Sequence, residues 1–503
     1  MTLASRPFVI PALIAVLAGV GLVAAFAPLN LWPLAVLSPA VLLLVWSGRS
    51  PGQAWWLGFA FGLGYYGVGV SWVFNSIYEF GQAPLPFAAA LTTLFVLVLA
   101  LYPALTGWIH ARFERAYPSA HALRWVVFLP AIWVLGEGFR GWFLTGFPWL
   151  WLGYSQVSSP LGGVAPVLGT LGVSWIVMLL AGLLVFALRV RGPLRWRALG
   201  GGLVVVLAAW GAGQIRWTES AGKPIQAVLI QGNIQQDNKW DQDWLIPTVE
   251  RYLELTHRNL DVDLIVWPEA ALPGRYHIFK DSVLEPLRAE LRDKGVDLLL
   301  GILYKSERGT HNSILKQGED VEVYHKRHLV PFGEYIPLRD WLNWLGDMVI
   351  LPAADITPGS EATLLTAAGQ PVAASICYEA AYGAEMADRL PQATLLVNVS
   401  NDAWFGDSFA PWQHLQIAQM RALELGRPML RATNSGISAM IDHRGKVLVQ
   451  SPQFKIAVVH GDITPQQGAT PFVRFRHWPV LSLAGLLVLL AGAYARYART
   501  RVH

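Results

Sequence analysis

Cysteine is nearly absent from this sequence, since its 503 residues contain one, Cys377. A single thiol excludes any disulfide within the chain, so no disulfide framework holds the fold together. The residue ends an apolar run that starts at Pro371, which suits a small, buried core side chain. Because a lone thiol can also act as a nucleophile, the residues around it decide between a packing role and a chemical one.

Charged residues are scarce, at 14%, and unevenly distributed, while hydrophobic residues make up 54%. Outside residues 222–468 the sequence has no lysine and only four acidic residues, against 16 arginines. Within 222–468 it has 22 basic and 30 acidic residues, a formal charge of −8. This composition indicates a basic membrane part and an acidic soluble domain, and the acidic balance argues against nucleic acid as a partner.

Eight apolar stretches are long enough, at about 20 residues each, to be candidate membrane helices. They lie near residues 8–28, 30–47, 55–77, 86–110, 124–143, 163–188, 197–214 and 478–495. Pro33 and Pro39 interrupt the second stretch, so a short or tilted helix is expected there. The sequence predicts a multi-pass α-helical membrane domain of seven helices at 1–217 and an eighth helix at 477–497.

Arginine placement predicts the orientation, because short loops rich in arginine and lysine stay in the cytoplasm. With the N-terminus inside, the inner loops hold Arg6, Arg49, Arg112, Arg115, Arg124, Arg189, Arg191, Arg195 and Arg197, and the C-terminal tail holds Arg496, Arg499 and Arg501. The alternate short loops hold Arg140, and Arg216, Arg474 and Arg476 flank the soluble domain. Both termini are therefore expected in the cytoplasm, with residues 222–468 on the outer face.

Short β-rich runs alternate with polar helical segments from Lys223 onward. Buried strands are expected at 225–230, 264–267, 296–300, 372–376 and 395–399, a further strand at 321–324, and a hairpin at 436–441 and 446–450. Residues 241–260 have the spacing of an amphipathic helix. This order predicts an α/β domain at 222–468 in which helices cover a sheet.

Three chemically different side chains follow strands of this domain. Glu269 follows the strand at 264–267, Lys326 follows the strand at 321–324, and Cys377 follows the strand at 372–376. Because ligands of α/β sheets sit at the carboxyl ends of strands, acid, amine and thiol are expected to converge on one nucleophilic site. Each alone has a structural explanation: a helix cap or solvated turn for the acid, a solvated charge run for the lysine, and core packing for the thiol.

At these residues the chain resembles the nitrilase superfamily, and within it the apolipoprotein N-acyltransferase family of membrane enzymes. The matching segments are Gly141–Gln156, Gln231–Asn233, Trp267–Glu269, Tyr324–Tyr335, Ile376–Glu379 and Asn398–Gly406. The resemblance covers essentially the whole chain. It implies an αββα sandwich for the soluble domain, with Glu269, Lys326 and Cys377 as a catalytic triad.

The resemblance also implies a reaction and its setting. The sn-1 acyl chain of phosphatidylethanolamine would form a thioester on Cys377 and then move to the α-amino group of the diacylglyceryl-cysteine of a bacterial apolipoprotein. Glu269 would be the base, and Lys326 with the backbone amide of Tyr378 would stabilise the oxyanion. No cofactor or metal is implied, and the family resides in the bacterial inner membrane with its catalytic domain in the periplasm.

Further residues are expected to support this site. Glu334 is similar to a second family carboxylate and is expected to orient Lys326 or share its charge. Tyr378 and Glu379 directly follow the nucleophile and are expected to shape the pocket. Trp240 matches a family aromatic near the site, and packing against the following helix is an equally good interpretation of it.

The segment Trp341–Pro352 is too apolar for an ordinary soluble loop. Its residues Trp341 and Trp344 are typical of segments that lie at a membrane interface. One hypothesis is a mobile lid that admits acyl chains, and the alternative is packing onto the transmembrane helices.

Two other classes of function fit parts of the sequence. A membrane-tethered carbon-nitrogen hydrolase, either an amidase or a nitrilase, would use the same triad on a small soluble substrate. A transporter or scaffold would use the outer domain only to bind, but the predicted spans hold almost no ionisable residues that could mark a transport path. A binding domain also has no use for a thiol beside an acid and a lysine, so acyl transfer is the favoured function.

Overall fold

The computed structural model describes residues 8–342 and 355–500. The chain divides into two compact units. The first contains the described residues up to Val73, together with Ala89–Ile215 and the residues from Phe475 on. The second contains Phe74–Ala88 and Arg216–Arg474, so it is built from two separate stretches of the chain.

The first unit is helical, and its apolar helices make this a membrane protein. Its longer helices are α1 (Val9–Val23), α2 (Leu34–Trp46), α3 (Pro51–Gly69), α5 (Leu85–Ala116), α6 (Leu129–Arg140), α7 (Ala165–Arg189), α8 (Pro193–Ala212) and α16 (Trp478–Thr500). Among the described residues, three helical segments are long and apolar enough to cross a membrane, at 85–116, 160–189 and 478–497. Helix α3 and the segment Val73–Phe80, bent by 61°, form a fourth candidate.

Small residues let the helices of this unit approach closely. A Cβ atom at Gly19 of α1 would lie 2.1 Å from the carbonyl oxygen of Phe61 in α3. A Cβ atom at Gly64 of α3 would lie 2.2 Å from the carbonyl oxygen of Val16 in α1. Reciprocal glycines of this kind are typical of helix pairs in membranes, where close backbone packing takes the place of hydrophobic burial as the driving force.

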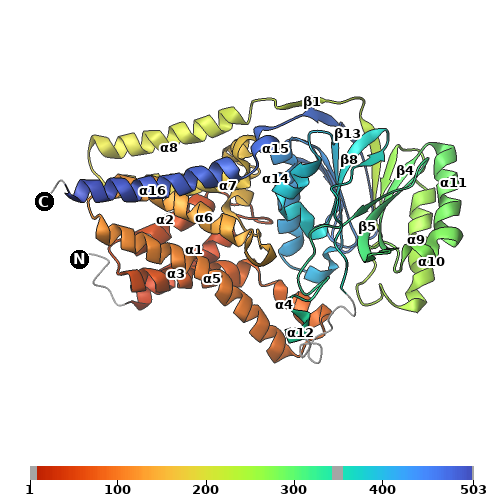
Figure 1. Ribbon diagram of the computed structural model, residues 1–503, viewed down its shortest axis with the longest axis horizontal. Coiled ribbons are helices and arrows are strands. Elements are labelled where there is room, and N and C mark those ends of the chain that lie inside the picture. Colours follow the sequence, from red (N-terminus) through yellow and green to blue (C-terminus); the bar gives the residue numbers. More distant parts are fainter. Residues whose placement is uncertain (1–7, 343–354, 501–503) are drawn as a thin grey trace. The chain divides into compact units, whose positions relative to one another are not determined.

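Two six-stranded sheets form the centre of the second unit (Figure 1). The first sheet has the order β13-β2-β3-β4-β5-β6, with strands Ala457–Ile463, Ile225–Gln231, Leu264–Val266, Asp297–Ser306, Gly309–Gln317 and Glu322–His325. The second has the order β12-β11-β10-β9-β8-β7, with strands Val447–Gln450, Ala439–Ile441, Met429–Thr433, Leu395–Ser400, Gln370–Ile376 and Leu365–Ala367. Three neighbouring strands in each sheet are parallel: β2, β3 and β4 in the first, and β8, β9 and β10 in the second.

Apolar residues on both faces of the strands explain the layering. Leu229 and Val266 point into a core that the first sheet shares with Val397 of the second. Their neighbours Val228 and Ile265 belong to another core on the opposite face of the first sheet. Since successive side chains of a strand point to opposite faces, continuous apolar runs require cover on both sides.

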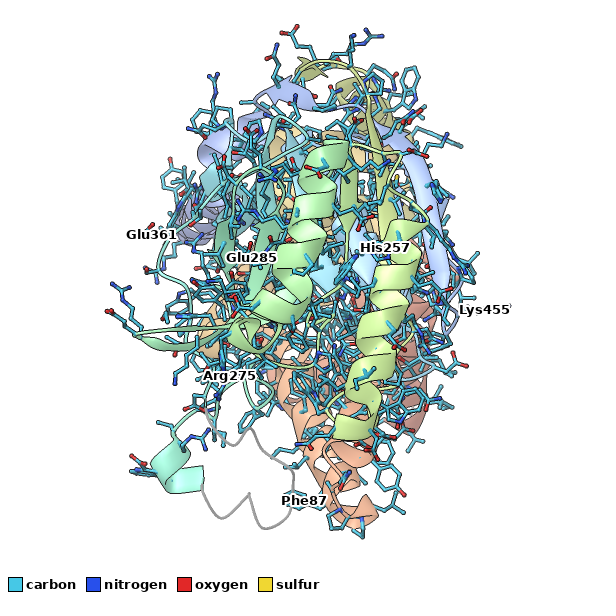
Figure 2. All side chains as sticks on the ribbon, turned by 90° about the vertical axis from the view of Figure 1, so that its right-hand side faces the viewer. Phe87, His257, Arg275, Glu285, Glu361 and Lys455 are labelled. Atoms are coloured by element: carbon cyan, nitrogen blue, oxygen red, sulfur yellow. The ribbon has the colours of Figure 1, made fainter. Side chains whose placement is uncertain are left out.

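Helices provide that cover, and the result is the predicted αββα sandwich. Helices α9 (Leu245–His257) and α11 (Glu285–Lys294) lie on the outer face of the first sheet, and α14 (Ala410–Leu425) lies on the outer face of the second (Figure 1). Figure 2 shows α9 and α11 side by side, and His257 of α9 forms an ion pair with Glu290 of α11 at 3.1 Å. The predicted strands and the helix at 241–260 are confirmed, whereas β5, β7, β10 and β13 of the two sheets were not predicted.

The stretch Phe74–Ala88 contributes to the second unit by direct contacts. The side chain of Asn75 donates to the carbonyl oxygen of Phe405 at 3.1 Å, and the hydroxyl of Ser76 donates to that of Trp404 at 2.8 Å. The rings of Phe80 and Trp404 meet edge to face, with centroids 5.6 Å apart. These contacts hold the turn that follows β9.

Gly301 of β4 is expected to tolerate no side chain. A Cβ atom there would lie 2.4 Å from the carbonyl oxygen of Pro268 and 2.5 Å from the Cα of Glu269. We predict that Gly301→Ala lowers stability by about 1–3 kcal/mol, the usual cost of overpacking. The thermal unfolding midpoint in detergent measures this change. In Gly200→Ala, where a Cβ meets nothing within 4 Å, the midpoint should not fall; equal midpoints in the two variants would contradict the prediction.

Candidate active site

Three strand ends carry the predicted acid, amine and thiol. Glu269 lies just beyond β3, Lys326 directly follows β6, and Cys377 directly follows β8. Cys377 begins a short 3₁₀ turn and has a φ of 50°, a left-handed conformation that non-glycine residues seldom adopt. The ammonium of Lys326 lies 3.8 Å from Oε1 of Glu269. The structure therefore brings the acid and the amine into one ion pair.

The thiol of Cys377 lies within the electrostatic influence of both other groups. Burial and the carboxylate of Glu269 raise the pKa of Cys377 to about 12, although Lys326 acts in the opposite direction. A thiol with this pKa is protonated at neutral pH and needs a base before it can act as a nucleophile. The backbone carbonyl of Cys377 accepts hydrogen bonds from Asn398 at 3.4 Å and from His414 at 3.1 Å.

The carboxylate of Glu269 is held by one neutral donor on each oxygen. The side-chain amide of Asn312 in β5 donates to Oε1 at 2.7 Å. The backbone N–H of Asn401, just after β9, donates to Oε2 at 2.9 Å. Glu269 is only 8% exposed, so these bonds replace water and fix the plane of the carboxylate. An ionised carboxylate in this setting can accept a proton from a neighbouring group.

Lys326 is buried and paired with a second carboxylate. Its ammonium lies 2.8 Å from Oε2 of Glu334, which also accepts from the backbone N–H of Val330 at 2.8 Å. Burial opposes the charge, but Glu334 and Glu269 together raise the pKa of Lys326 well above its usual value. The residue therefore stays an ammonium and can act as a hydrogen-bond donor. Glu334 sits where it orients this donor.

Glu379 links the segment that carries Lys326 to the segment that carries Cys377. Its Oε1 accepts from the hydroxyl of Tyr324 and from the backbone N–H of Arg327, both at 2.8 Å, and from that of His328 at 3.2 Å. Its Oε2 accepts from the backbone N–H of Ile376 at 2.7 Å. The carboxylate thus ties the ends of β6 and β8 together.

The predicted aromatic residues lie in different places. Tyr378 follows Cys377, and its ring packs edge to face on Tyr382 at 5.1 Å. Trp240 is 51% exposed. Trp341 is 82% exposed on the short helix α12 (Arg339–Leu342), and Trp344 lies outside the described residues.

Several site residues were missed from the sequence. Asn312 bridges the two carboxylates, since its amide also donates to Oε1 of Glu334 at 2.9 Å. It lies in β5, where polar residues obscure the strand pattern, so no signal identified it. His414 of α14 connects Asp402 to the carbonyl of Cys377, with Nδ1 3.0 Å from Oδ1 of Asp402. The segment 398–406 carries the family resemblance, but the sequence alone assigns no roles to its residues.

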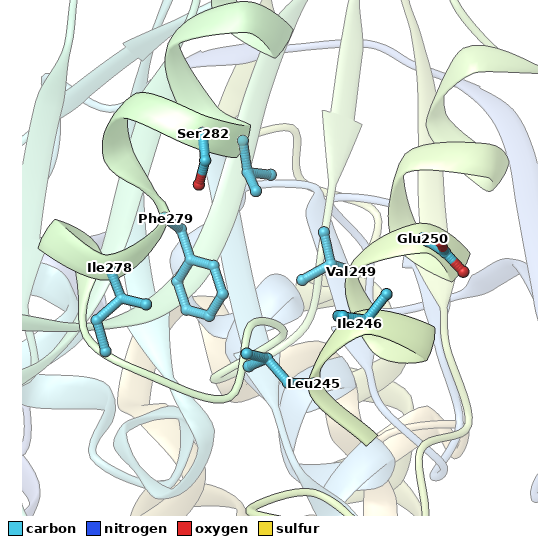
Figure 3. Close-up of a pocket in the computed structure, with 8 residues that line it drawn as sticks. Leu245, Ile246, Val249, Glu250, Ile278, Phe279 and Ser282 are labelled. Carbon is cyan, nitrogen blue, oxygen red and sulfur yellow. The ribbon is translucent and has the colours of Figure 1, made fainter. Parts of the chain in front are cut away.

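An apolar groove lies elsewhere on this unit, between α9 and the helical segment 276–284 (Figure 3). It has a volume of about 270 Å³ and is lined by Leu245, Ile246, Val249, Glu250, Ile278, Phe279, Ser282 and Val283. None of these residues belongs to the cluster around Cys377. The groove is therefore separate from that cluster.

Replacing Asn312 is expected to slow the reaction without unfolding the protein. Asn312→Leu removes the donor shared by Glu269 and Glu334, and a hydrogen bond to a charged group contributes about 1.5–3 kcal/mol. We predict a fall of roughly 10- to 100-fold in the turnover rate. Asn259→Leu, which removes a bond to the Leu255 carbonyl in α9, is the matched control. An unchanged rate in Asn312→Leu would show that the bridge is dispensable.

Family models match both units of the chain. Residues 18–183 match the model described as Apolipoprotein N-acyltransferase N-terminal domain. Residues 226–470 match the model described as Carbon-nitrogen hydrolase.

Relatives that match over nearly the whole chain are apolipoprotein N-acyltransferases. The chain is 45% identical over 487 residues to an apolipoprotein N-acyltransferase of Methylococcus capsulatus, covering 96% of each. It is 45% identical over 490 residues to one of Nitrosomonas europaea, covering 96% of this chain and 97% of the relative. Among solved structures, a carbon-nitrogen hydrolase superfamily protein of Xanthomonas campestris aligns with a TM-score of 0.35 and 18% identity, over 52% of this chain and 97% of that one.

Proposed function

Because the chain belongs to the apolipoprotein N-acyltransferase family, we propose that it moves the sn-1 acyl chain of phosphatidylethanolamine to the α-amino group of the diacylglyceryl-cysteine of bacterial apolipoproteins. One observation carries the chemical part of this proposal: the ammonium of Lys326 lies 3.8 Å from the carboxylate of Glu269, and both charges act on the thiol of Cys377 at the start of the turn after β8. Such a site supports covalent acyl transfer.

In the first half of the reaction, Glu269 accepts the proton of the Cys377 thiol. The thiolate attacks the ester carbonyl, and Lys326 with the backbone N–H of Tyr378 stabilises the oxyanion that forms. The carbon–oxygen bond then breaks, Glu269 returns the proton to the departing oxygen, and a lysophospholipid leaves. The acyl group remains on sulfur as a thioester.

In the second half, the α-amino group of the apolipoprotein cysteine attacks that thioester. Glu269 accepts a proton from the attacking nitrogen, the carbon–sulfur bond breaks, and the proton returns to the sulfur of Cys377. An amide forms and the thiol is restored, so donor and acceptor react in turn at one site. Glu334 orients Lys326 throughout, and Glu379 and Tyr378 shape the space around the nucleophile. None of these steps requires a cofactor.

The proposal also includes the number of membrane helices and their orientation. We place eight membrane helices in two regions, seven within 1–217 and one at 477–497, with the catalytic domain at 222–468. The arginine distribution supports cytoplasmic termini and a periplasmic catalytic domain in the bacterial inner membrane. A reporter of accessibility near residue 300 that responded from the cytoplasm would contradict this topology.

A hydrolase that acts on a small soluble amide is not favoured. The relatives named apolipoprotein N-acyltransferase match over nearly the whole chain, including the helical region, rather than over the carbon-nitrogen hydrolase region alone. A soluble substrate would leave that helical region without a use in the reaction.

The covalent intermediate provides the first test. Intact-mass spectrometry after incubation with phosphatidylethanolamine should detect an acyl adduct that hydroxylamine removes, while Cys377→Ala should show none. Because Cys377 is the only cysteine, the adduct can be assigned to it without peptide mapping. Rapid hydrolysis of small amides without any adduct or released lysophospholipid would overturn the proposal.

Trp341 is proposed to contact the acyl chains of the donor, because a large, exposed aromatic ring suits a lipid surface. Trp344 is expected to share this role. Trp341→Ala should raise the KM for phospholipid severalfold with little change in kcat, as expected when binding alone is weakened. Acylation of Cys377 by a short-chain, water-soluble ester should be unaffected. Equal KM values for phospholipid in the native and variant proteins would exclude the contact. Trp240 is a further candidate for substrate contact.

A further inference from the structure

The proposed site has more buried negative charge than its triad alone can balance. Glu269 and Glu334 both lie in it, and the triad supplies one cation, Lys326. With both carboxylates ionised, these three groups carry a net charge of −1. Formation of a thiolate from Cys377 in such a surrounding is unfavourable, because like charges repel strongly where water is scarce.

A second lysine, Lys239, lies against this cluster. It belongs to the loop between β2 and α9, and it is only 3% exposed although the next residue, Trp240, is on the surface. Its ammonium donates a hydrogen bond to the backbone carbonyl oxygen of Glu269 at 3.0 Å. Buried lysines are rare, and a buried ammonium requires compensation by a nearby acid.

The charges that act on Lys239 come from the site itself. Burial lowers the pKa of Lys239 to about 8, while Glu269 and Cys377 oppose this shift. The residue is therefore still largely cationic at neutral pH. Cys377 in turn responds to Glu269, Lys326 and Asp402, which lie beyond the ends of β3, β6 and β9. Asp402 is itself paired with Arg431 at 2.8 Å and with His414 at 3.0 Å.

We propose that Lys239 is a positioning residue for the acyl transfer, which holds the backbone turn at Glu269 and supplies the second positive charge that makes the Cys377 thiolate accessible. The turn has little freedom, because Ala270 has a φ of 44° and the backbone of Gly301 packs closely against it. With Lys239 charged, the ammonium groups of Lys239 and Lys326 together balance the carboxylates of Glu269 and Glu334. The role in transfer rests on the proposed function, whereas the effect on the thiol does not.

Alkylation of the single cysteine tests the effect of Lys239 on the ionisation of Cys377 directly, without any lipid. The rate of reaction of Cys377 with iodoacetamide, followed by intact mass across a range of pH, reports its thiolate fraction. Lys239→Met should react about tenfold more slowly than the native protein at neutral pH, the effect of a shift of one pKa unit. The difference should narrow above about pH 8, because Lys239 of the native protein loses its own charge there.

Two further variants separate charge from packing. Lys239→Gln keeps a donor for the Glu269 carbonyl but lacks the charge, so it should behave like Lys239→Met if charge is the cause. Lys316→Met is the matched control, because Lys316 is also buried and pairs with Asp297 at 3.3 Å in another part of the domain. Its alkylation rate should equal that of the native protein.

The outcomes are distinct. Native-like alkylation in both Lys239 variants would overturn the proposal, and slowing in Lys239→Met but not in Lys239→Gln would reduce the role to a hydrogen bond. If alkylation slows as expected but no acyl adduct forms from phospholipid even in the native protein, the proposed function fails while the role of Lys239 in thiol ionisation stands.

Discussion

The position of the Glu269 carboxylate is held by hydrogen bonds from both sheets of the sandwich. It extends from the end of β3 in the first sheet, accepts from Asn312 of β5 in that sheet, and accepts from the backbone of Asn401 beyond β9 in the second. Any slip between the two sheets would break one of these bonds and leave a buried charge unsatisfied, which is costly. The apolar core between the sheets, where Leu229 and Val397 lie, therefore maintains the geometry of the Glu269 carboxylate as well as the stability of the domain.

Glu379 performs the corresponding task for the other two groups. It receives backbone donors from both sides of the site, so the position of Lys326 and that of Cys377 are set by one carboxylate. Three carboxylates lie at or beside the site in different environments: Glu269 accepts one neutral donor on each oxygen, Glu334 pairs with Lys326, and Glu379 accepts backbone donors from both sides and acts as a structural bridge. Environment, rather than residue type, distinguishes them.

The layers of the sandwich, and the positions of Glu269, Lys326 and Cys377 just beyond strands, could be predicted because both follow from simple sequence patterns. Continuous apolar runs identify strands covered on two faces. Glu269 and Cys377 stand just beyond such runs, and Lys326 follows the short, mixed strand β6. Asn312 and Lys239 could not be predicted, because the polar residues of β5 hide its strand and a lysine beside an exposed tryptophan resembles a solvated residue. Of the eight predicted spans, the structure supports three or four by length and composition among the described residues. Helices α1, α2 and α6 have only 15, 13 and 12 residues.

The hydrogen bonds from Asn75 and Ser76 to the turn after β9 limit where the chain can be truncated to obtain the second unit alone. The catalytic unit is discontinuous, with its smaller stretch encoded between two helices of the membrane part. A truncated protein that begins near residue 216 would lack that stretch and would leave Trp404 without its aromatic neighbour Phe80. A secreted catalytic fragment for screening or crystallisation would therefore need those residues supplied as a peptide or grafted by a linker.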